Sequence, residues 1–329
     1  MCAEIFIVLS DFQARVASIL IKDRIESSKL VLVAPKFLKE RYFAKAQVQY
    51  IPVPYSPSSQ GVFGVFCRAF NEKKTLKALL SEVESFDRLK IYAPHFEGFL
   101  SNWLFCGFST RDEVSFNLIQ DGVLSYYRCR PNNLKMSTKK IMSAILRERF
   151  KSRIDEITMI ASEKIEKNFV FFGVEHTLIP NKACSIDPLK KRKVVNGSGA
   201  IIIGQEPIVQ KMGIDSYQSI VSSMVEAAYE RSQDVSYVFH PRSDQKLKAM
   251  IKPILERSRV KVISLNSSVE DYVLENGDIR FVFAHSSSAL FLIKILVEDG
   301  VECFSFAQER DESSRKINSA LKAAGVHFL

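Results

Sequence analysis

Short apolar runs alternate with longer segments of helical spacing along this chain, and this alternation limits its fold to a few classes. Segments such as Phe12–Glu26 and Asn71–Phe86 place apolar residues three and four positions apart, which predicts helices. Strands that are apolar on both faces and alternate with helices predict a parallel sheet covered on both sides. In the first half of the chain the predicted strands are Ile5–Ser10, Lys29–Ala34, Leu89–Tyr92 and Val114–Ile119.

A polar stretch over 179–199 interrupts the alternation. It contains Pro180, Pro188, the basic run Lys190–Lys193 and Asn196–Gly199, so it predicts a linker. The alternation then resumes, with predicted strands Ala200–Ile203, Val235–Phe239, Val260–Ile263, Ile279–Phe283 and Glu302–Phe304 and predicted helices Ser216–Arg231 and Asp244–Glu256. The 329 residues suit two domains better than one. We predict an α/β protein with two doubly wound, Rossmann-like domains, 1–185 and 186–329, facing a central cleft that binds ligands.

Composition narrows the class of protein. An apolar content of 47% with 25% charged residues is that of a soluble globular protein, and no apolar run is long enough to predict a membrane-spanning helix. The six cysteines form no Cys-x-x-Cys pair, so we expect reduced thiols in a cytoplasmic protein and no structural zinc. The net charge of +9 is compatible with nucleic acid, anionic lipid or a phosphorylated substrate as partner, and equally with none of them.

Three polar clusters follow predicted strands, where an α/β fold places its sites. The first is Gln120-Asp121-Gly122, after Val114–Ile119. Asp121 could act as a general base, and Gly122 would let a substrate or another backbone segment come close. An ordinary Asp-Gly turn is the alternative interpretation.

The second cluster is His240-Pro241-Arg242, where proline prevents the strand from continuing past the histidine. An imidazole at the edge of a sheet can donate to phosphate oxygens. The third cluster is Ser286–Ser288, just before a helical segment, where hydroxyl and unpaired N–H groups form an anion site. A structural histidine and simple N-capping by serine are the alternatives.

Several common signatures are absent from the sequence. It has neither a Gly-x-x-x-x-Gly-Lys-Ser/Thr loop nor a Gly-x-Gly-x-x-Gly turn, which argues against the usual nucleotide sites. A Gly-x-Ser-x-Gly elbow is also missing. Without an Asp-x-Asp pair or paired metal-ligand spacing among the five histidines, we predict no metal.

Taken in order, the three clusters resemble the acidic-Gly, His-Pro and Ser/Thr motifs of bacterial sialyltransferases. The resemblance is strongest to the group of lipooligosaccharide sialyltransferases and capsular polysialyltransferases. It extends to Gly204-Gln205-Glu206-Pro207 after the first strand of the second half, and His240 precedes Ser286 by 46 residues, as in that group. The likeness covers the chain in layout, although each motif is short.

The resemblance implies an inverting GT-B glycosyltransferase that moves sialic acid from CMP-sialic acid to a terminal sugar of a bacterial lipooligosaccharide or capsule. Residues 1–185 would form the acceptor-side domain and 186–329 the CMP-binding domain. Asp121 would be the base and His240 would hold the departing phosphate, which needs no metal because CMP carries a single phosphate. The nucleotide-binding residues it implies are Gly204, Gln205, His240, Pro241, Arg242, Glu270, Ser286, Ser287 and Ser288.

One residue departs from the family's motifs, and two others have alternative roles. The family's first motif has two acidic residues before glycine, and Gln120 replaces the first of them here. Asp215 is a rival base, because some members of the group place the carboxylate shortly before the His-Pro motif. A helix N-cap is the alternative role for Asp215. Glu270 could accept from ribose hydroxyls, or it could be a solvated residue at a helix start.

A basic segment over Lys135–Arg153 predicts an amphipathic helix, with Ile141, Ile145 and Leu146 in its apolar stripe. Together with Lys190–Lys193 it could hold the enzyme on the anionic inner face of the cytoplasmic membrane. A solvated helix packed by its stripe is the alternative. The basic residues assigned to the membrane contact are Lys135, Lys139, Lys140, Arg147 and Arg149.

Two other functions remain open at this point. A GT-B transferase could use a different nucleotide sugar, such as CMP-Kdo. A non-catalytic protein that binds nucleic acid or another polyanion would explain the charge of +9. Because the basic residues cluster away from the three strand-end sites and no recognition motif is present, we expect no nucleic-acid partner.

Overall fold

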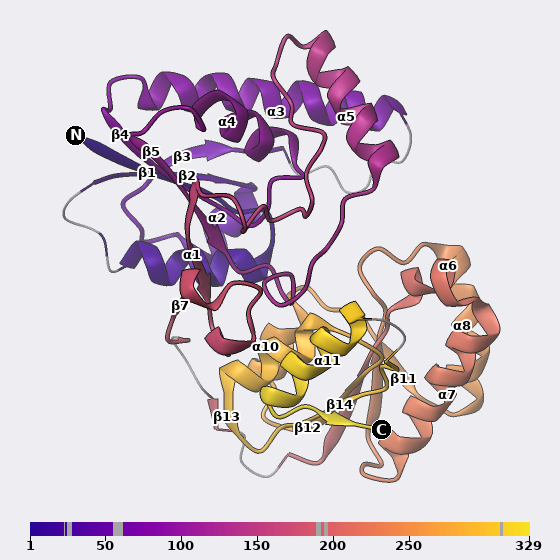
Figure 1. Ribbon diagram of the computed structural model, residues 1–329. Helices are drawn as coiled ribbons and strands as arrows, with labels where there is room; N and C mark the ends of the chain where they lie inside the picture. Colours follow the sequence, from indigo (N-terminus) through magenta and orange to yellow (C-terminus); the bar gives the residue numbers. More distant parts are fainter. Residues whose placement is uncertain (23, 25–27, 55–61, 189–191, 194–196, 310–311) are drawn as a thin grey trace. The chain divides into compact units, whose positions relative to one another are not determined.

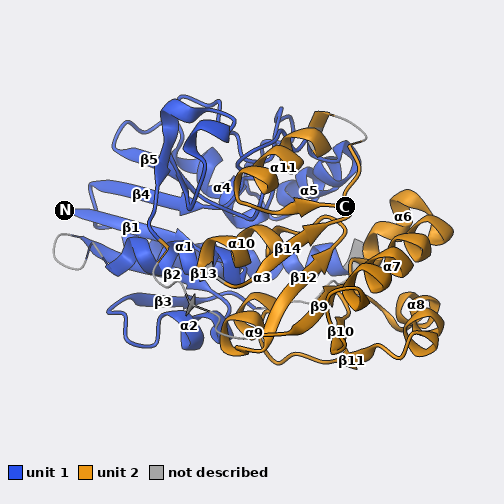
Figure 2. Ribbon diagram, turned by 90° about the horizontal axis from the view of Figure 1, so that it is seen from below, with its two compact units in different colours: residues 1–187 blue, residues 188–329 orange. Residues whose placement is uncertain are grey.

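The computed structural model describes residues 1–22, 24, 28–54, 62–188, 192–193, 197–309 and 312–329 (Figure 1). The chain divides into two compact units, unit 1 over Met1–Asp187 and unit 2 over Pro188–Leu329 (Figure 2). Each unit has its own parallel sheet and its own hydrophobic core. No helix in the described part of the chain is both long and apolar enough to cross a bilayer.

Unit 1 is built on a sheet in the order β3-β2-β1-β4-β5-β6-β7, with every neighbouring pair parallel. Helices α3 and α4 cover one face of this sheet and α1 covers the other (Figure 1). The direction of winding reverses between β1 and β4, and a doubly wound sheet opens its ligand crevice at that point. Its elements are β1 (Cys2–Ile7), α1 (Asp11–Lys22), β2 (Lys29–Ala34), α2 (Lys36–Tyr42), β3 (Gln49–Pro52), α3 (Val62–Val83), β4 (Arg88–Ala93), α4 (Phe99–Phe108), β5 (Val114–Ile119), α5 (Asn133–Ile145), β6 (Ile165–Val170), the 3-10 turns η1 (Val174–His176) and η2 (Pro180–Lys182), and β7 (Ala183–Ser185).

The central strands of unit 1 are buried on both faces. Ile5 and Ile7 of β1 belong to the core beneath α3 and α4, and Phe6, between them, is also fully buried. Trp103 of α4 donates a hydrogen bond of 2.8 Å from its ring nitrogen to Ser143 Oγ, which fastens α5 to α4. Burial from both sides explains why the predicted strand runs are apolar at every position.

Unit 2 repeats the plan in the order β11-β10-β9-β12-β14-β15, again parallel throughout. Its winding reverses between β9 and β12. Helix α7 packs on one face through Tyr217, Val221 and Met224, and α10 covers the other. The elements are β8 (Arg192–Lys193), β9 (Gly199–Ile203), η3 (Glu206–Ile208), α6 (Val209–Met212), α7 (Ile214–Tyr229), β10 (Val235–Val238), α8 (Gln245–Arg257), β11 (Lys261–Ile263), α9 (Val269–Glu275), β12 (Ile279–Ala284), α10 (Ser288–Leu296), β13 (Val297–Asp299), β14 (Glu302–Ser305), α11 (Glu312–Ala323) and β15 (His327–Phe328).

The predicted alternation of strands and helices is confirmed in both units, but the linker predicted over 179–199 is wrong in its first part. Ala183–Ser185 forms β7, which pairs with β6 and completes the first sheet. A three-residue edge strand is too short to show a periodic pattern. Lys190 and Lys191 of the basic run lie outside the described residues, and Arg192–Lys193 forms β8 beside β13.

The helix predicted over Lys135–Arg153 is also wrong beyond Ile145. Leu146 is the C-cap of α5, and Arg147 follows in the left-handed region at φ 59°, so Arg149 is not on a helix. The chain is then fastened to α4, because Asn102 accepts from the Lys151 N–H at 2.8 Å and donates to the Lys151 carbonyl at 3.1 Å. This tertiary contact replaces the next helical turn.

Candidate active site

In unit 1 the loops after β4 and β5 lie side by side at the carboxyl edge of the sheet. Ala93 of β4 is paired with Leu118 of β5, so the segment 94–98 is adjacent to Gln120-Asp121-Gly122. Asp121 is half-buried in this position. The first predicted cluster therefore lies one strand away from the point where the winding reverses.

Gln120 holds the Asp121 loop in place. Its side chain is fully buried, accepts from the Phe171 N–H at 2.8 Å and donates to the Gly122 carbonyl at 2.9 Å. A glutamate could accept from Phe171 but could not donate to Gly122 while ionised, so an amide suits this site better than the family's acidic residue. Gly122 has φ 57°, a conformation that favours glycine.

His95 is a second polar residue at this edge, and it was not among the predicted site residues. Its Nδ1 is buried and has no hydrogen-bond partner among the described residues. Burial lowers the pKa of His95, although the negative charges of Asp121 and Glu97 act in the opposite direction. The ring is therefore neutral near pH 7, and it carries an unpaired nitrogen beside the candidate base. The Pro94-His95 pair directly after a strand was the signal that could have identified it.

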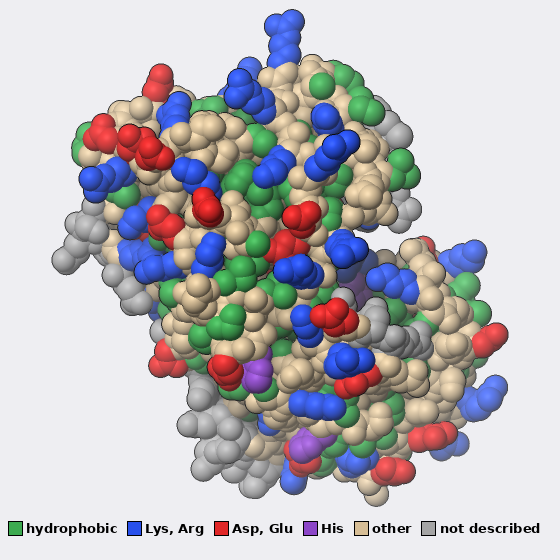
Figure 3. All heavy atoms as spheres, in the orientation of Figure 1, with side chains coloured by type: hydrophobic (Ala, Val, Ile, Leu, Met, Phe, Trp, Pro, Cys, Tyr) green, Lys and Arg blue, Asp and Glu red, His purple; other side chains and the backbone are tan. Residues whose placement is uncertain are grey.

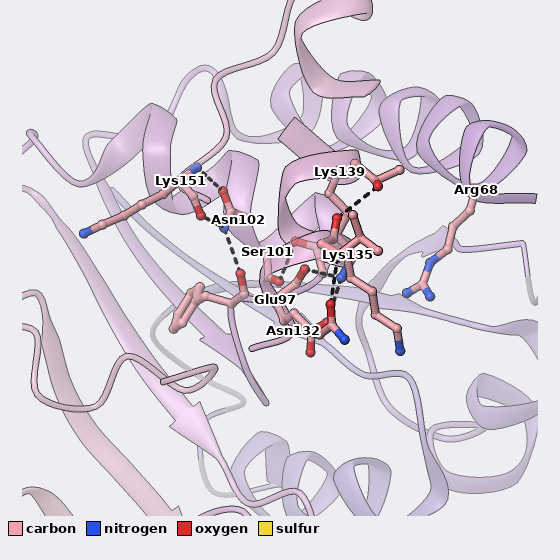
Figure 4. Close-up of polar contacts among 12 residues, drawn as sticks. Arg68, Glu97, Ser101, Asn102, Asn132, Lys135, Lys139 and Lys151 are labelled. Atoms are coloured by element: carbon pink, nitrogen blue, oxygen red, sulfur yellow. Dashed lines mark hydrogen bonds and ion pairs between the residues drawn. The ribbon is translucent and has the colours of Figure 1, made fainter. Parts of the chain in front are cut away.

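Glu97 and Lys139 form an ion pair next to this edge (Figure 4). Lys139 Nζ donates to Glu97 Oε1 at 3.0 Å and to the Glu97 carbonyl at 2.8 Å, and its side chain is only 18% exposed. Burial lowers the pKa of Lys139 against the effect of the carboxylate. Figure 4 shows Arg68 of α3 and Lys135 of α5 extending beside the pair. The expectation that Lys139 contacts a membrane is therefore wrong, because its ammonium group is held by Glu97 inside unit 1.

A pocket with a volume of about 170 Å³ opens at the ends of the first three strands of unit 1. Glu72 organises one side of it, accepting from Arg68 Nε at 2.7 Å and from the N–H of Leu100, in the first turn of α4, also at 2.7 Å. A buried carboxylate thus positions an arginine that is half exposed. The lining residues are Leu9, Pro35, Val53, Pro54, Arg68, Asn71 and Glu72.

In unit 2 the Gln205 side chain connects the ends of β9 and β12. Its Oε1 accepts from the Ser286 N–H at 2.9 Å, and its Nε2 donates to the Ser286 carbonyl. The Gln205 N–H in turn donates to the Tyr217 hydroxyl at 2.6 Å. Gln205 therefore fixes the start of the serine motif at the point where the winding of this sheet reverses.

Glu206 connects the end of β9 to the His-Pro loop after β10. It is fully buried, and its Oε2 accepts from the His240 N–H at 2.9 Å and from the Ser243 hydroxyl at 2.5 Å. Its Oε1 accepts from the Tyr237 hydroxyl at 2.5 Å. Burial raises the pKa of Tyr237, which keeps that hydroxyl a donor. Glu206 was predicted only as part of a motif, without a role of its own, and its hydrogen bond to the His240 N–H positions that residue.

The two nitrogens of the His240 ring have different environments. Nδ1 accepts from the Arg242 N–H at 3.1 Å, so the neutral ring carries its proton on Nε2. Burial lowers the pKa of His240 and the Arg242 charge lowers it further, with Glu206 opposing. A neutral imidazole with a fixed Nε2–H is a directed donor at the strand edge. Pro241 and Arg242 are exposed beside it.

Ser287 caps α10, which is one of the two roles that the sequence allowed for the serine motif. Its hydroxyl accepts from the Ala289 N–H at 3.2 Å, and Ser288 is the first helical residue. All three serines are half-buried. Helix α10, which begins at Ser288, is nine residues long and mostly buried. The positive end of its dipole therefore lies at the strand edge.

The remaining predicted residues of unit 2 lie on helices. Glu270 is in the first turn of α9, behind the N-cap Ser268, and α9 packs against α10. Asp215 is exposed in the first turn of α7, where Gly213 is the N-cap, so the N-cap alternative for Asp215 is wrong. Gly204 packs directly under Glu206 and Tyr237. Among the described residues no group of three His, Cys, Asp or Glu side chains could hold a metal ion, and the absence of a metal stays a prediction.

Solved structures with this fold include enzymes that act on sugars. No protein-family model matches the sequence, and neither does any curated protein. The chain is similar to the α/β-galactoside α-2,3-sialyltransferase of the luminous marine bacterium Photobacterium phosphoreum, at 11% identity over 99% of this chain and 98% of that one, with a TM-score of 0.53. It is equally similar to the UDP-GlcNAc 2-epimerase of Neisseria meningitidis bound to UDP-GlcNAc, at 12% identity over 99% and 87%, with a TM-score of 0.54. These likenesses confirm the predicted GT-B type of fold, two Rossmann-like units.

Proposed function

We propose that this protein is an inverting glycosyltransferase that moves sialic acid from CMP-sialic acid to a sugar acceptor of a bacterial surface glycan. The observation that carries the proposal is the set of hydrogen bonds made by the side chains of Gln205 and Glu206. These hydrogen bonds connect the serine motif after β12 and the His-Pro loop after β10 to the end of β9, the strand that lies between them.

The donor phosphate would bind at this edge of unit 2. His240 offers a directed Nε2–H, and the start of α10 offers serine hydroxyls and the positive end of a helix dipole. These donors suit the single phosphate of CMP. Glu270, in the helix packed against α10, would accept from ribose hydroxyls.

The acceptor would be activated by Asp121 of unit 1. The acceptor hydroxyl oxygen forms a bond to the anomeric carbon of sialic acid while the bond from that carbon to the phosphate oxygen breaks. The electron pair of the broken bond leaves with CMP, where His240 stabilises it, and the hydroxyl proton passes to Asp121. Attack on the side opposite the leaving group inverts the anomeric configuration. A neutral His95 beside Asp121 adds no positive charge that would weaken the base.

A transfer assay with purified protein tests this proposal. CMP-sialic acid, CMP-Kdo and UDP-GlcNAc would be offered in parallel with a panel of galactose- and sialic acid-terminated acceptors. We expect transfer from CMP-sialic acid alone. Transfer only from CMP-Kdo would keep the mechanism and change the donor, whereas epimerisation of UDP-GlcNAc without any transfer would overturn the proposal.

A further inference from the structure

Helices α3 and α5 expose large apolar side chains next to basic ones. Phe70 is 46% exposed, and Ile141 and Ile145, one turn apart on α5, are each 59% exposed. The alternative in which the stripe packs α5 onto the protein is therefore wrong for Ile141 and Ile145, which face solvent, and holds only for Leu146. We call the region formed by Phe66, Phe70, Lys74, Lys77, Ile141, Ile145 and Arg147 the α3–α5 surface.

A groove of about 390 Å³ runs through the α3–α5 surface and has no acidic side chain in its lining. Its floor is fastened by Lys73, which donates to the Leu146 carbonyl and pairs with Glu148 at 3.1 Å. Lys74 and Lys77 are exposed, and Lys74 Nζ lies 4.8 Å from the centre of the Phe70 ring. Figure 3 shows blue basic and green hydrophobic side chains next to each other over the part of unit 1 where α5 lies.

The basic and apolar side chains of the α3–α5 surface favour one kind of partner over two others. Two copies of this chain meeting symmetrically through the surface would bring Lys74, Lys77 and Arg147 against the same charges of the partner. A nucleic acid would satisfy the basic residues but would leave Ile141 and Ile145 without a contact. An anionic lipid interface satisfies both, because headgroup phosphates lie above a layer that accepts apolar side chains.

We propose that the α3–α5 surface docks on anionic phospholipid bilayers. Phe66, Phe70, Ile141 and Ile145 enter the headgroup boundary, and Lys74, Lys77 and Arg147 bind lipid phosphates. The proposed membrane contact thereby keeps Arg147, leaves out Lys139 and gains exposed residues of α3. This inference does not depend on the proposed function, since docking requires no catalytic residue.

Arg147 allows a test that separates charge from folding. It stands directly after the C-cap of α5 at φ 59°, where glycine is the residue under least strain. Arg147→Gly should therefore remove the charge without destabilising the helix end. Arg259 is a matched control in unit 2, at φ 56° directly after the C-cap of α8. Arg259→Gly removes the same charge from the same local conformation.

The experiment is co-sedimentation of the full chain with vesicles of 70% phosphatidylcholine and 30% phosphatidylglycerol, and with pure phosphatidylcholine. We expect binding to the anionic vesicles only. Arg147→Gly should weaken it about five-fold, and combining it with Lys74→Gln and Lys77→Gln should weaken it roughly 100-fold. The double variant Phe70→Ser, Ile145→Ser should bind anionic vesicles more weakly than the parent even in low salt. Arg259→Gly should bind as the parent does.

Three results would overturn the proposal. One is equal binding by the triple variant and the parent, and another is equal binding to neutral and anionic vesicles. The third result combines two observations. The parent protein binds no vesicles, and analytical ultracentrifugation shows that it is a dimer that Ile145→Ser converts to a monomer. That result would assign the surface to contact between copies of the chain.

Discussion

At the scale of single residues, the sequence predicted which polar side chains follow the strands, but it did not predict the hydrogen bonds that position them. Asp121 and His240 were predicted because each follows an apolar run, and both stand at strand ends in the structure. Gln205 contacts a residue 81 positions away and Glu206 contacts one 34 positions away. No local pattern reports contacts at such separations, so the residues that position the candidate site had to come from the structure.

The pH dependence of nucleotide binding tests the placement of His240. Burial and Arg242 hold its pKa below the ordinary 6.5 in the free protein, and a bound phosphate would raise it. A group whose pKa rises on binding takes up a proton, so affinity for CMP should increase as the pH falls from about 8 to about 6. Calorimetric titrations at several pH values would measure this for the parent and for His240→Asn. The titration of CMP itself is common to both proteins, so parallel pH profiles would remove His240 from the phosphate site.

Asp121→Asn tests the base. The substitution keeps the size of the side chain and removes its ability to take a proton, so turnover should fall by about 10²- to 10⁴-fold. CMP affinity should stay unchanged, because the proposed nucleotide contacts lie in unit 2. Asp215→Asn is the matched control and should have a mild effect. Near-parental transfer by Asp121→Asn together with a collapse in Asp215→Asn would move the base to α7.

At the scale of elements, the accuracy of the prediction followed the strength of the tertiary constraint. β2 and β5 have the predicted bounds because their apolar runs are buried along their whole length. β1 was expected over Ile5–Ser10 but spans Cys2–Ile7, since its partners β2 and β4 determine which residues can pair. α5 was predicted too long because its sequence pattern continues past the point where Asn102 fastens the chain.

Gly204→Ala tests how closely β9 supports the site. A Cβ at this position would overlap Glu206 Oε1 and lie 2.6 Å from the Tyr237 hydroxyl, and both groups are buried and hydrogen-bonded. Overpacking there should lower the free energy of unfolding by about 1–3 kcal/mol and weaken CMP binding. Gly107, in the exposed part of α4, has open space around its Cβ position. Gly107→Ala should raise stability by about 0.5–1 kcal/mol in the same urea titration. Equal effects of the two substitutions would show that the β9 turn can relax.

At the scale of the whole molecule, the two units have sheets with the same winding but carry different polar side chains at the carboxyl edges of those sheets. Each sheet reverses direction next to its first strand, and each carries its candidate residues on the loops at that edge. Unit 1 presents carboxylates and a neutral histidine, which suit the activation of a hydroxyl group. Unit 2 presents hydrogen-bond donors and a helix start, which suit a phosphate. Under the proposed function, the two strand edges would take separate roles in one transfer reaction.

Hydrogen exchange measured with and without CMP tests this division of roles. Saturation with CMP at about 100 times its Kd should stabilise the binding unit by about 2.7 kcal/mol, which slows exchange through unfolding of that unit about 100-fold. We expect this slowing at the core amides of β9, β10 and β12, and local protection in the loops after these strands, at Gln205, His240 and Ser286–Ser288. The segments 94–98 and 120–122 of unit 1 should exchange as before, because they are assigned to the acceptor. Adding EDTA should leave the pattern unchanged, and UMP should give weaker protection at the same concentration. Protection that requires added Mg²⁺, or that appears in unit 1 and not in unit 2, would contradict the assignment of the nucleotide to unit 2 without a metal.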